Sequence, residues 1–266
     1  MNDVKPFALV TGASSGIGLE LARQLAERGH DLIVNAEDEA RLERAAGHIR
    51  EAGTVVHTVP ADLRFPERTE ALYAAVTATG RPLDVAVLNA GVGRGGAFVD
   101  TDLADDLEVV DLNVRSTVHL AKLVLRDMAA RDDGRVLVTS SIASTMPGSY
   151  QAVYNASKSF LQSFTQALRN EFEGTGVTLT SLMPGPTETD FFHRAGMDDT
   201  PVGRQDKDDP AQVARQGLDA LFAGKDKLTA GSARTKAQGL ANKVLPDRLK
   251  AEAHRRMAEP DSDEGA

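Results

Sequence analysis

The chain has 266 residues, of which 41% are hydrophobic and 26% are charged, and its formal net charge is −9. A chain of this length buries enough apolar surface to fold without covalent staples, and it has no cysteine, which excludes disulfides and thiolate catalysis. Four of the negative charges lie in the last eight residues, EPDSDEGA, so the remainder carries about −9 + 4 = −5 and offers no electrostatic support for nucleic acid or an anionic membrane as a partner.

The sequence also lacks the patterns of a metal site and of a membrane-spanning segment. The six histidines have no close spacing of the HExxH kind, so we expect no metal site. No stretch approaches about 20 apolar residues, and the N-terminal MNDVKPFALVTG has no basic region followed by a long apolar run. These features predict a cytoplasmic protein without stable membrane insertion.

Short apolar runs alternate with amphipathic stretches along the chain. Runs that are apolar on both faces suit parallel strands covered on both sides, and the alternation predicts right-handed crossovers. We therefore expect an α/β fold of three layers, with a doubly wound, mostly parallel sheet of about seven strands and helices on both faces, in a single domain over residues 1–266. The predicted strands are residues 7–12, 31–36, 54–62, 84–91, 135–141, 177–185 and 227–231, and the predicted helices are residues 16–29, 38–52, 66–79, 103–131 and 152–174.

The first predicted strand leads into a glycine-rich loop, TGASSGIG. Gly12, Gly16 and Gly18 stand where a strand passes into a helix, and glycine there permits a tight turn and lets a pyrophosphate approach the backbone. The helix N-terminus adds unpaired N–H groups and a partial positive charge, and Ser14 and Ser15 add hydroxyl donors. The alternative is a turn that needs glycine only for packing. The strand before the loop and the helix after it favour a dinucleotide site.

Two acidic residues follow the second predicted strand. An acid about twenty residues beyond the glycine loop can accept hydrogen bonds from an adenosine ribose and repel a 2′-phosphate, and Glu37 stands there. Alternatively, Glu37 or Asp38 only caps the next helix, and Asp38 suits that role three residues before Arg41. Glu37 favours NAD over NADP, while Arg41 keeps a contact with a 2′-phosphate open.

The stretch TSSIASTMPGSYQAVYNASKSF concentrates hydroxyl groups with a tyrosine and a lysine. Tyr154 and Lys158 are four residues apart and share one helix face, so the ammonium is expected to lower the pKa of the phenol from about 10. Ser141 ends a strand nearby and can donate to a substrate oxygen that gains charge. The alternative is a solvated pair on a helix surface. Asn113 is a poor helix former inside a long helical pattern, which predicts a local helix distortion.

Two later segments bear on the site. Residues 186–209 are irregular and follow the end of a strand, which favours a substrate lid over a tolerated surface insertion. Residues 233–258 form one or two amphipathic helices interrupted near Pro246. They can cover the active site, pack on another subunit or touch a membrane, but the pattern favours a solvated terminal helix pair. We expect residues 259–266 to be a flexible acidic tail.

Several motifs occur in an order and spacing that resemble the short-chain dehydrogenases/reductases. From Phe7 to about Gly224 the chain contains, in turn, TGASSGIG, ADL, NAG, DLNV, SS, YNASK and PGPTET. The middle of the chain is similar to a single-domain bacterial branch of this family. The resemblance implies a Rossmann fold and an NAD(P)-dependent oxidoreductase that transfers hydride between nicotinamide and a carbonyl or secondary alcohol.

The resemblance also assigns site residues. Tyr154 is implied as the general acid/base, Lys158 as the group that lowers its pKa and holds the ribose, Ser141 as the group that polarises the substrate oxygen, and Asn113 as support for a proton relay through water. The implied cofactor-binding residues are Gly12, Ser14, Ser15, Gly16, Ile17, Gly18, Glu37, Asp62, Leu63, Asn89, Ala90, Gly91, Tyr154, Lys158, Pro184, Gly185, Thr187 and Thr189.

The sequence departs from the family pattern at two places. Leu88 stands where many members have a second asparagine before Asn89. Ala36 and Glu37 stand where NAD-dependent members often have Asp and NADP-dependent members often have Arg, so the cofactor is NAD or NADP, with Glu37 favouring NAD.

Other functions remain open beside the reductase. One alternative is an epimerase or dehydratase on the same fold, and another is a non-catalytic NAD(P) sensor or scaffold. The apolar stripe of Phe160, Phe164, Leu168 and Phe172 is typical of a core, and the matching helix of the family often forms a subunit interface. We therefore expect a homo-oligomer, a dimer or tetramer, that binds a small carbonyl or alcohol substrate and no nucleic acid.

Overall fold

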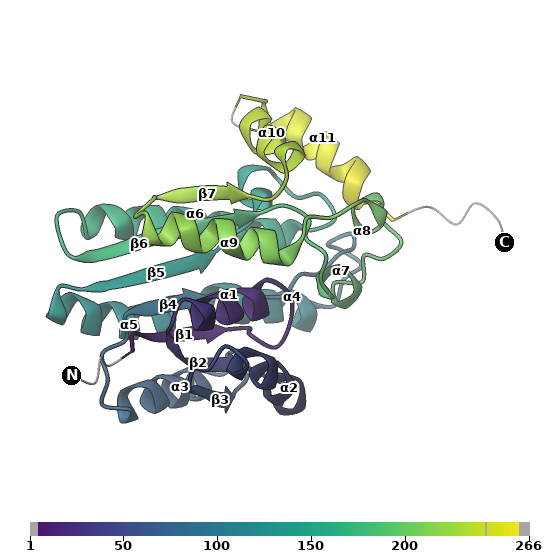
Figure 1. The fold of residues 1–266 in the computed structure, drawn as a ribbon. Helices are drawn as coiled ribbons and strands as arrows, with labels where there is room; N and C mark the ends of the chain where they lie inside the picture. The colour runs from purple at the N-terminus through teal and green to yellow at the C-terminus, as the bar shows by residue number, and fades with distance from the viewer. Residues whose placement is uncertain (1–4, 243, 261–266) are drawn as a thin grey trace.

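The computed structural model describes residues 5–242 and 244–260, and its centre is one parallel sheet (Figure 1). The seven strands lie in the order β3-β2-β1-β4-β5-β6-β7, and every neighbouring pair is parallel. The predicted α/β sheet is confirmed. The strands are β1 (Phe7–Thr11), β2 (Asp31–Ala36), β3 (Val56–Pro60), β4 (Val85–Leu88), β5 (Gly134–Thr139), β6 (Val177–Pro184) and β7 (Lys227–Ala230).

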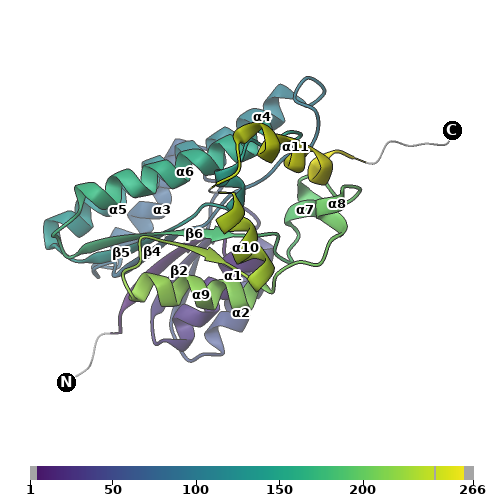
Figure 2. The same ribbon diagram turned by 90° about the horizontal axis from the view of Figure 1, so that it is seen from above.

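Helices cover both faces of the sheet (Figure 2). One face packs against α1 (Gly16–Glu27), α2 (Glu39–Arg50) and α9 (Pro210–Phe222), and the other against α3 (Pro66–Ala78), α5 (Ser116–Arg131) and α6 (Ala152–Glu171). Each face has its own cluster of buried apolar side chains. Because both faces are covered, every residue of β1 is buried, which explains the unbroken apolar run in the sequence.

The remaining short elements include the connections around the carboxyl ends of the strands. The π-helix η1 (Val110–Arg115) follows α4 (Leu103–Val109), and the 3-10 helix η2 (Ile142–Thr145) follows β5. Beyond the strand ends lie α7 (Phe191–Arg194), α8 (Pro201–Arg204), α10 (Ala233–Ala241) and α11 (Asp247–Ala258) (Figure 2). The chain turns from one side of the sheet to the other between β1 and β4, and open α/β sheets bind ligands at such a point.

The sequence prediction differs from the structure in three places. Helix α9 was not predicted, although Asp209 caps it by accepting a hydrogen bond from the Ala211 N–H at 3.0 Å. The irregular segment 186–209 contains the one-turn helices α7 and α8. The tail is not free from its first residue, because Glu259 accepts a 2.6 Å hydrogen bond from the Tyr150 hydroxyl. The rest of the predicted tail, from residue 261 onward, lies outside the described residues.

The helix predicted over residues 103–131 contains the expected distortion. It is divided into α4, the π-helical η1 and α5, and Asn113 lies within η1. A π turn inside an α-helix often marks a functional site. In the part of the chain that the structure describes, no helix has the length and apolar character needed to cross a bilayer.

Candidate active site

The predicted site residues meet in one cleft at the carboxyl ends of β1, β4, β5 and β6. Every predicted cofactor residue lines this cleft, and so do Ser141, Tyr154 and Lys158. Asn113 lies beside it and is fully buried. Residues from distant parts of the sequence therefore converge where the fold places ligands.

The glycine loop between β1 and α1 has the backbone geometry that only glycine readily supplies. Gly12 and Gly16 have φ angles of +66° and +56°, in the left-handed region. A β-carbon on Gly18 would lie 2.0 Å from the Gly12 carbonyl oxygen, so this position needs glycine for close packing. The loop therefore needs glycine for its turn and for its packing, and the pyrophosphate contact stays a prediction.

The start of α1 is open to an anion. Ser15 precedes the helix, and its side chain makes no capping hydrogen bond to the first turn. The first N–H groups of an α-helix have no partner within the helix, and they carry a partial positive charge. A pyrophosphate fits this end of the helix, and Ser14, Ser15 and Gly16 all line the cleft there.

Asn89 ties together the strand ends beneath the loop. Its amide nitrogen lies 3.1 Å from the Thr11 carbonyl oxygen, and its amide oxygen accepts a hydrogen bond from the Thr139 hydroxyl at 3.1 Å. The Thr11 hydroxyl accepts from the backbone N–H groups of Asn89 and Ala90. These bonds fix the ends of β1, β4 and β5 relative to one another.

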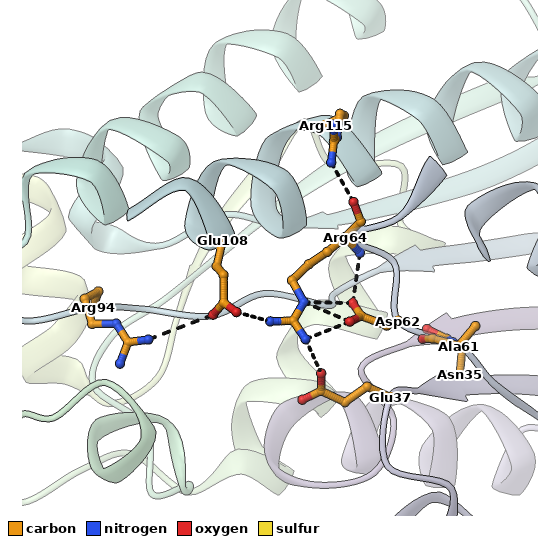
Figure 3. Close-up of polar contacts among 8 residues, drawn as sticks. All are labelled: Asn35, Glu37, Ala61, Asp62, Arg64, Arg94, Glu108 and Arg115. Atoms are coloured by element: carbon orange, nitrogen blue, oxygen red, sulfur yellow. Dashed lines mark hydrogen bonds and ion pairs between the residues drawn. The ribbon is translucent and has the colours of Figure 1, made fainter. Parts of the chain in front are cut away.

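The two acids after β2 have different functions in the fold. Asp38 caps α2 by accepting a 2.9 Å hydrogen bond from the Arg41 N–H, as the capping alternative predicted. Glu37 lines the cleft and leaves the capping to its neighbour. Its carboxylate lies 3.3 Å from the guanidinium of Arg64, which also pairs with Asp62 (Figure 3). Arg64 was not singled out in the sequence.

Tyr154 and Lys158 lie on the first turns of α6 with Ser141 nearby. The Lys158 ammonium is 5.8 Å from the centre of the Tyr154 ring and donates a 3.0 Å hydrogen bond to the Thr139 carbonyl. Burial raises the pKa of Tyr154 to about 12, although the Ser141 hydroxyl acts in the opposite direction. Burial lowers the pKa of Lys158 to about 8.

These directions correct one expectation. The sequence argument had Lys158 lowering the pKa of Tyr154, but in the folded chain the loss of solvent around the phenol outweighs any such effect. Tyr154 is therefore a protonated, neutral phenol at neutral pH. The surface-pair alternative is wrong, because Lys158 is only 5% exposed and both groups line the cleft.

Asn113 holds the strand-end backbone in place. Its side-chain oxygen accepts from the Val92 N–H at 2.9 Å, and its nitrogen donates to the Val92 carbonyl and to the Ser157 hydroxyl. A β-carbon on Gly91 would lie 3.0 Å from the Asn113 oxygen and 3.3 Å from the Lys158 nitrogen. The Asn113 side chain therefore fixes the backbone at Gly91 and Val92, which lies beside Lys158. Both of its N–H groups already donate hydrogen bonds.

The segment after β6 folds over the glycine loop. A β-carbon on Gly16 would lie 2.7 Å from the Thr189 methyl group, and the ring of Phe191 packs 5.2 Å from that of Tyr154. Arg41, on α2, reaches across to Asp190 with an ion pair of 2.5 Å. Arg41, the residue that the sequence left as a possible ligand for a 2′-phosphate, is thus already paired with this segment.

The C-terminal helices cover the catalytic end of the cleft. His254 and Met257 of α11 line the cleft, as does Gln238 of α10. The His254 Nδ1–H donates to the Ser149 carbonyl at 2.9 Å, and burial lowers the pKa of this imidazole. The solvated helix pair that the sequence favoured is wrong, because these helices line the cleft and His254 is buried. The amphipathic pattern alone did not say which surface these helices meet.

Comparisons with known proteins agree with this geometry. The family model of the short chain dehydrogenases matches residues 6–199. The chain is a short-chain dehydrogenase/reductase. It is an NAD(P)-dependent oxidoreductase acting on C=O and CH–OH groups, as the resemblance implied.

Individual relatives are similar over most of the chain. A protein of Streptomyces coelicolor that carries the name of a candidate ketoacyl reductase is 40% identical over 68% of this chain and 70% of its own length. A 3-oxoacyl-(acyl-carrier-protein) reductase of Vibrio cholerae is 32% identical over 80% of this chain and 88% of its own.

Solved structures extend the similarity to the fold. A variant of the actinorhodin polyketide ketoreductase with NADPH superimposes with a TM-score of 0.74 and 33% identity, over 85% of this chain and 95% of that one. A short-chain dehydrogenase of Sphingobium yanoikuyae in complex with NADPH has a TM-score of 0.79 and 27% identity, over 91% and 96%.

Proposed function

We propose that this short-chain dehydrogenase/reductase works as an NADH-preferring carbonyl reductase with Tyr154 as its general acid. The observation that carries the proposal is the convergence of Ser141, Tyr154 and Lys158 in the cleft that the glycine loop also lines. A sensor or scaffold needs no such constellation. An epimerase or dehydratase uses the same cleft but regenerates its cofactor within each cycle, so stoichiometric oxidation of NADH distinguishes the two.

The cleft fits a nicotinamide dinucleotide. The glycine loop leaves space for a pyrophosphate at α1, Glu37 and Asp62 stand at the adenosine end, and Lys158, Thr187 and Thr189 stand at the nicotinamide end. Bound NADH supplies the hydride for the carbonyl carbon. Tyr154 donates its proton to the substrate oxygen, and Ser141 donates a hydrogen bond to the same oxygen as its charge grows.

The protonation of Tyr154 supports the direction of reduction. A phenol with a pKa of about 12 keeps its proton at neutral pH. It is still a stronger acid than the product alcohol, if the pKa of that alcohol is taken as close to that of bulk water, roughly 15 to 16. Oxidation needs the phenolate and is expected to gain rate as pH rises. Asn113 contributes by positioning the Gly91–Val92 backbone. Both side-chain N–H groups of Asn113 already have acceptors. We infer that any proton relay past Lys158 uses groups other than these.

The preference for NADH rests on charge. Glu37 and Asp62 line the adenosine end of the cleft, and the guanidinium of Arg64 that pairs with both is shared with Glu108, so the two acids are only partly neutralised. Arg41 is paired with Asp190. An acid at the ribose position accepts the 2′-hydroxyl and repels a 2′-phosphate.

The test is a fluorescence titration with NADH and, separately, with NADPH, followed by a ketone panel that includes acetoacetyl-CoA. We expect NADH to bind at least tenfold more tightly, since about 1.4 kcal/mol of charge repulsion suffices for that ratio. Tighter binding of NADPH would overturn the cofactor preference alone. Binding of neither cofactor would overturn the reductase.

The substrate side of the cleft is mixed in character. Its apolar surface comes from the lid-like segment and the C-terminal helix, and its polar groups come from glutamine, histidine and arginine side chains. The apolar residues include Met146, Phe191, Phe192, Val202 and Met257, and the polar ones include Gln151, Arg194, Gln205, Gln238 and His254. We infer a ketone or 3-ketoacyl group with an apolar body, in keeping with the ketoacyl reductases among the relatives.

Lys158 makes cofactor binding sensitive to pH. Its pKa of about 8 means that the ammonium present at neutral pH becomes a neutral amine as pH rises. The charged form attracts the anionic dinucleotide and holds the ribose hydroxyls. We therefore expect the Kd for NADH to be constant from about pH 6 to 7 and to rise above pH 8. A Lys158→Met variant should bind more weakly at every pH and show no break near pH 8; a break retained in that variant would assign it to another group.

A homo-oligomer in the cytoplasm completes the proposal. Phe164, Leu168 and Phe172 pack on the core, whereas Phe160 is 42% exposed beside Phe164. Exposed apolar side chains on α4, Leu103 and Leu107, add to this surface. Light scattering tests the expected dimer or tetramer, and a monomer at all concentrations would contradict it. Cell fractionation tests the compartment.

A further inference from the structure

Arg64 occupies an unusual place for a basic residue, directly behind the adenosine end of the cleft. It follows β3 by a few residues, and its guanidinium forms a bidentate pair with Asp62, at 2.9 Å from Nε and 2.7 Å from Nη2 (Figure 3). The Arg64 N–H also donates to Asp62 at 3.0 Å. Asp62 lines the cleft, so Arg64 is one side chain away from a bound dinucleotide.

Two further carboxylates from different elements hold the same guanidinium. Nη2 lies 3.3 Å from Glu37, after β2, and Nη1 is hydrogen-bonded to Glu108 of α4. The Arg64 carbonyl accepts a 2.6 Å hydrogen bond from Arg115, which fixes the backbone. Every nitrogen of the Arg64 guanidinium therefore faces a carboxylate (Figure 3).

The position of this guanidinium matters for the choice of cofactor. In this fold the acid about twenty residues beyond the glycine loop binds the ribose 2′-hydroxyl, and an arginine near that place accommodates a 2′-phosphate. Arg64 touches Glu37 and so lies beside the place of the 2′-substituent. A guanidinium binds phosphate strongly when its N–H groups are free.

We propose that Arg64 is a latent ligand for a 2′-phosphate, and that Glu108, which does not line the cleft, determines cofactor preference by occupying Arg64. This proposal rests on the proposed preference for NADH. Glu108 is 40% exposed and holds the Nη1 side of Arg64, while Asp62 holds the opposite side. Removing the charge of Glu108 frees donors and reduces the negative charge at the adenosine end in one step.

The chain offers a matched control for Glu108. Arg94 pairs with Asp105 at 2.9 Å and with Glu108 at 3.9 Å, so both acids lie in the same charged cluster on α4. Asp105 is 41% exposed, as Glu108 is, but it makes no described contact with Arg64. A Glu108→Gln variant and an Asp105→Asn variant thus remove one acid of similar exposure each, and only the first releases Arg64.

The experiment measures the Kd for NADH and NADPH by nicotinamide fluorescence in the full chain. We expect Glu108→Gln to tighten NADPH binding by about fivefold, the scale of one partly screened ion pair, and to leave NADH binding within about twofold. Asp105→Asn should change neither by more than about twofold. Glu108→Ala should behave as Glu108→Gln does, and thermal unfolding checks that each variant is folded.

Two further measurements separate charge from packing. Adding Arg64→Gln to Glu108→Gln should abolish the gain in NADPH affinity, because the ligand itself is then missing. The gain should also shrink between about 0.05 and 0.5 M salt, as screening weakens exposed charge interactions.

The proposal is overturned if Glu108→Gln and Asp105→Asn shift NADPH binding equally, or if the gain survives without Arg64. The same titrations on the native chain separate this result from the proposed function. Native binding of NADH without the Glu108 effect overturns only the inference, whereas native binding of neither cofactor overturns both.

Discussion

Replacing Tyr154 with Phe is expected to lower kcat for ketone reduction by about 10³-fold, within the range that a positioned general acid contributes, and to leave the Kd for NADH within about twofold. The variant loses only the hydroxyl that protonates the substrate oxygen. The ring remains and keeps its packing against Phe191, 5.2 Å away. Stopped-flow reduction and NADH fluorescence measure the two quantities on one preparation.

A second tyrosine supplies the matched control. The hydroxyl of Tyr73, on α3, donates a hydrogen bond to Asp127 on α5, and Tyr73 does not line the cleft. Tyr73→Phe removes the same atom from the same residue type, and we expect kcat to be unchanged. If Tyr154→Phe keeps more than about a tenth of native kcat, the proton comes from another group and the assignment fails.

Much of this arrangement is predictable from the sequence because it depends on local geometry. The glycine spacing of TGASSGIG follows from one strand-to-helix turn, and the Tyr154–Lys158 spacing follows from one helix face. A local helix distortion at Asn113 was expected from a poor helix former inside a long helical pattern, and the structure has a π turn there. The central strands were recognisable because both of their faces are covered, and every residue of β1, β2 and β4 is buried.

The sequence did not predict contacts that join distant elements. Arg64 meets Glu37 and Glu108 only because the ends of β2 and β3 and the helix α4 lie side by side in the fold. The sequence signal for Arg64, a base two residues after Asp62, has no meaning until its neighbours are known. In the same way, the sequence around His254 did not predict that α11 packs over the cleft.

The pKa of Tyr154 shows why pairwise reasoning from sequence misses a sign. The i, i+4 spacing places an ammonium near the phenol but carries no information on solvent exposure. In the fold, Lys158 is buried and Tyr154 is half-buried, and desolvation moves each toward its neutral form: it raises the pKa of Tyr154 to about 12 and lowers that of Lys158 to about 8. A neutral phenol is the form that donates a proton during reduction.

Gly18→Ala is expected to damage the site through the backbone. The new β-carbon would lie 2.0 Å from the Gly12 carbonyl oxygen and 2.5 Å from the Asn89 amide nitrogen. To bring the new β-carbon to a van der Waals distance from the Gly12 oxygen, α1 or the glycine loop would have to move by more than about 1 Å. A displacement of about 1 Å in a positioning element can cost about 10²-fold, so we expect kcat/KM for NADH to fall by that factor. Overpacking should also lower the free energy of unfolding by about 1–3 kcal/mol.

Gly47→Ala is the control for the same chemical change in a helix. Gly47 lies on the exposed side of α2, and nothing lies within 4 Å of the β-carbon that alanine would add. Alanine there should raise the free energy of unfolding by about 0.4–1 kcal/mol, because it restricts the unfolded chain without strain. Denaturant unfolding and NADH kinetics are measured for both variants. A gain in stability at Gly47 reflects the helical preference for alanine, and a loss of stability and activity at Gly18 reflects a steric requirement for glycine. If Gly18→Ala were as active as Gly47→Ala, the glycine loop would not be held against Gly12 and Asn89 as described.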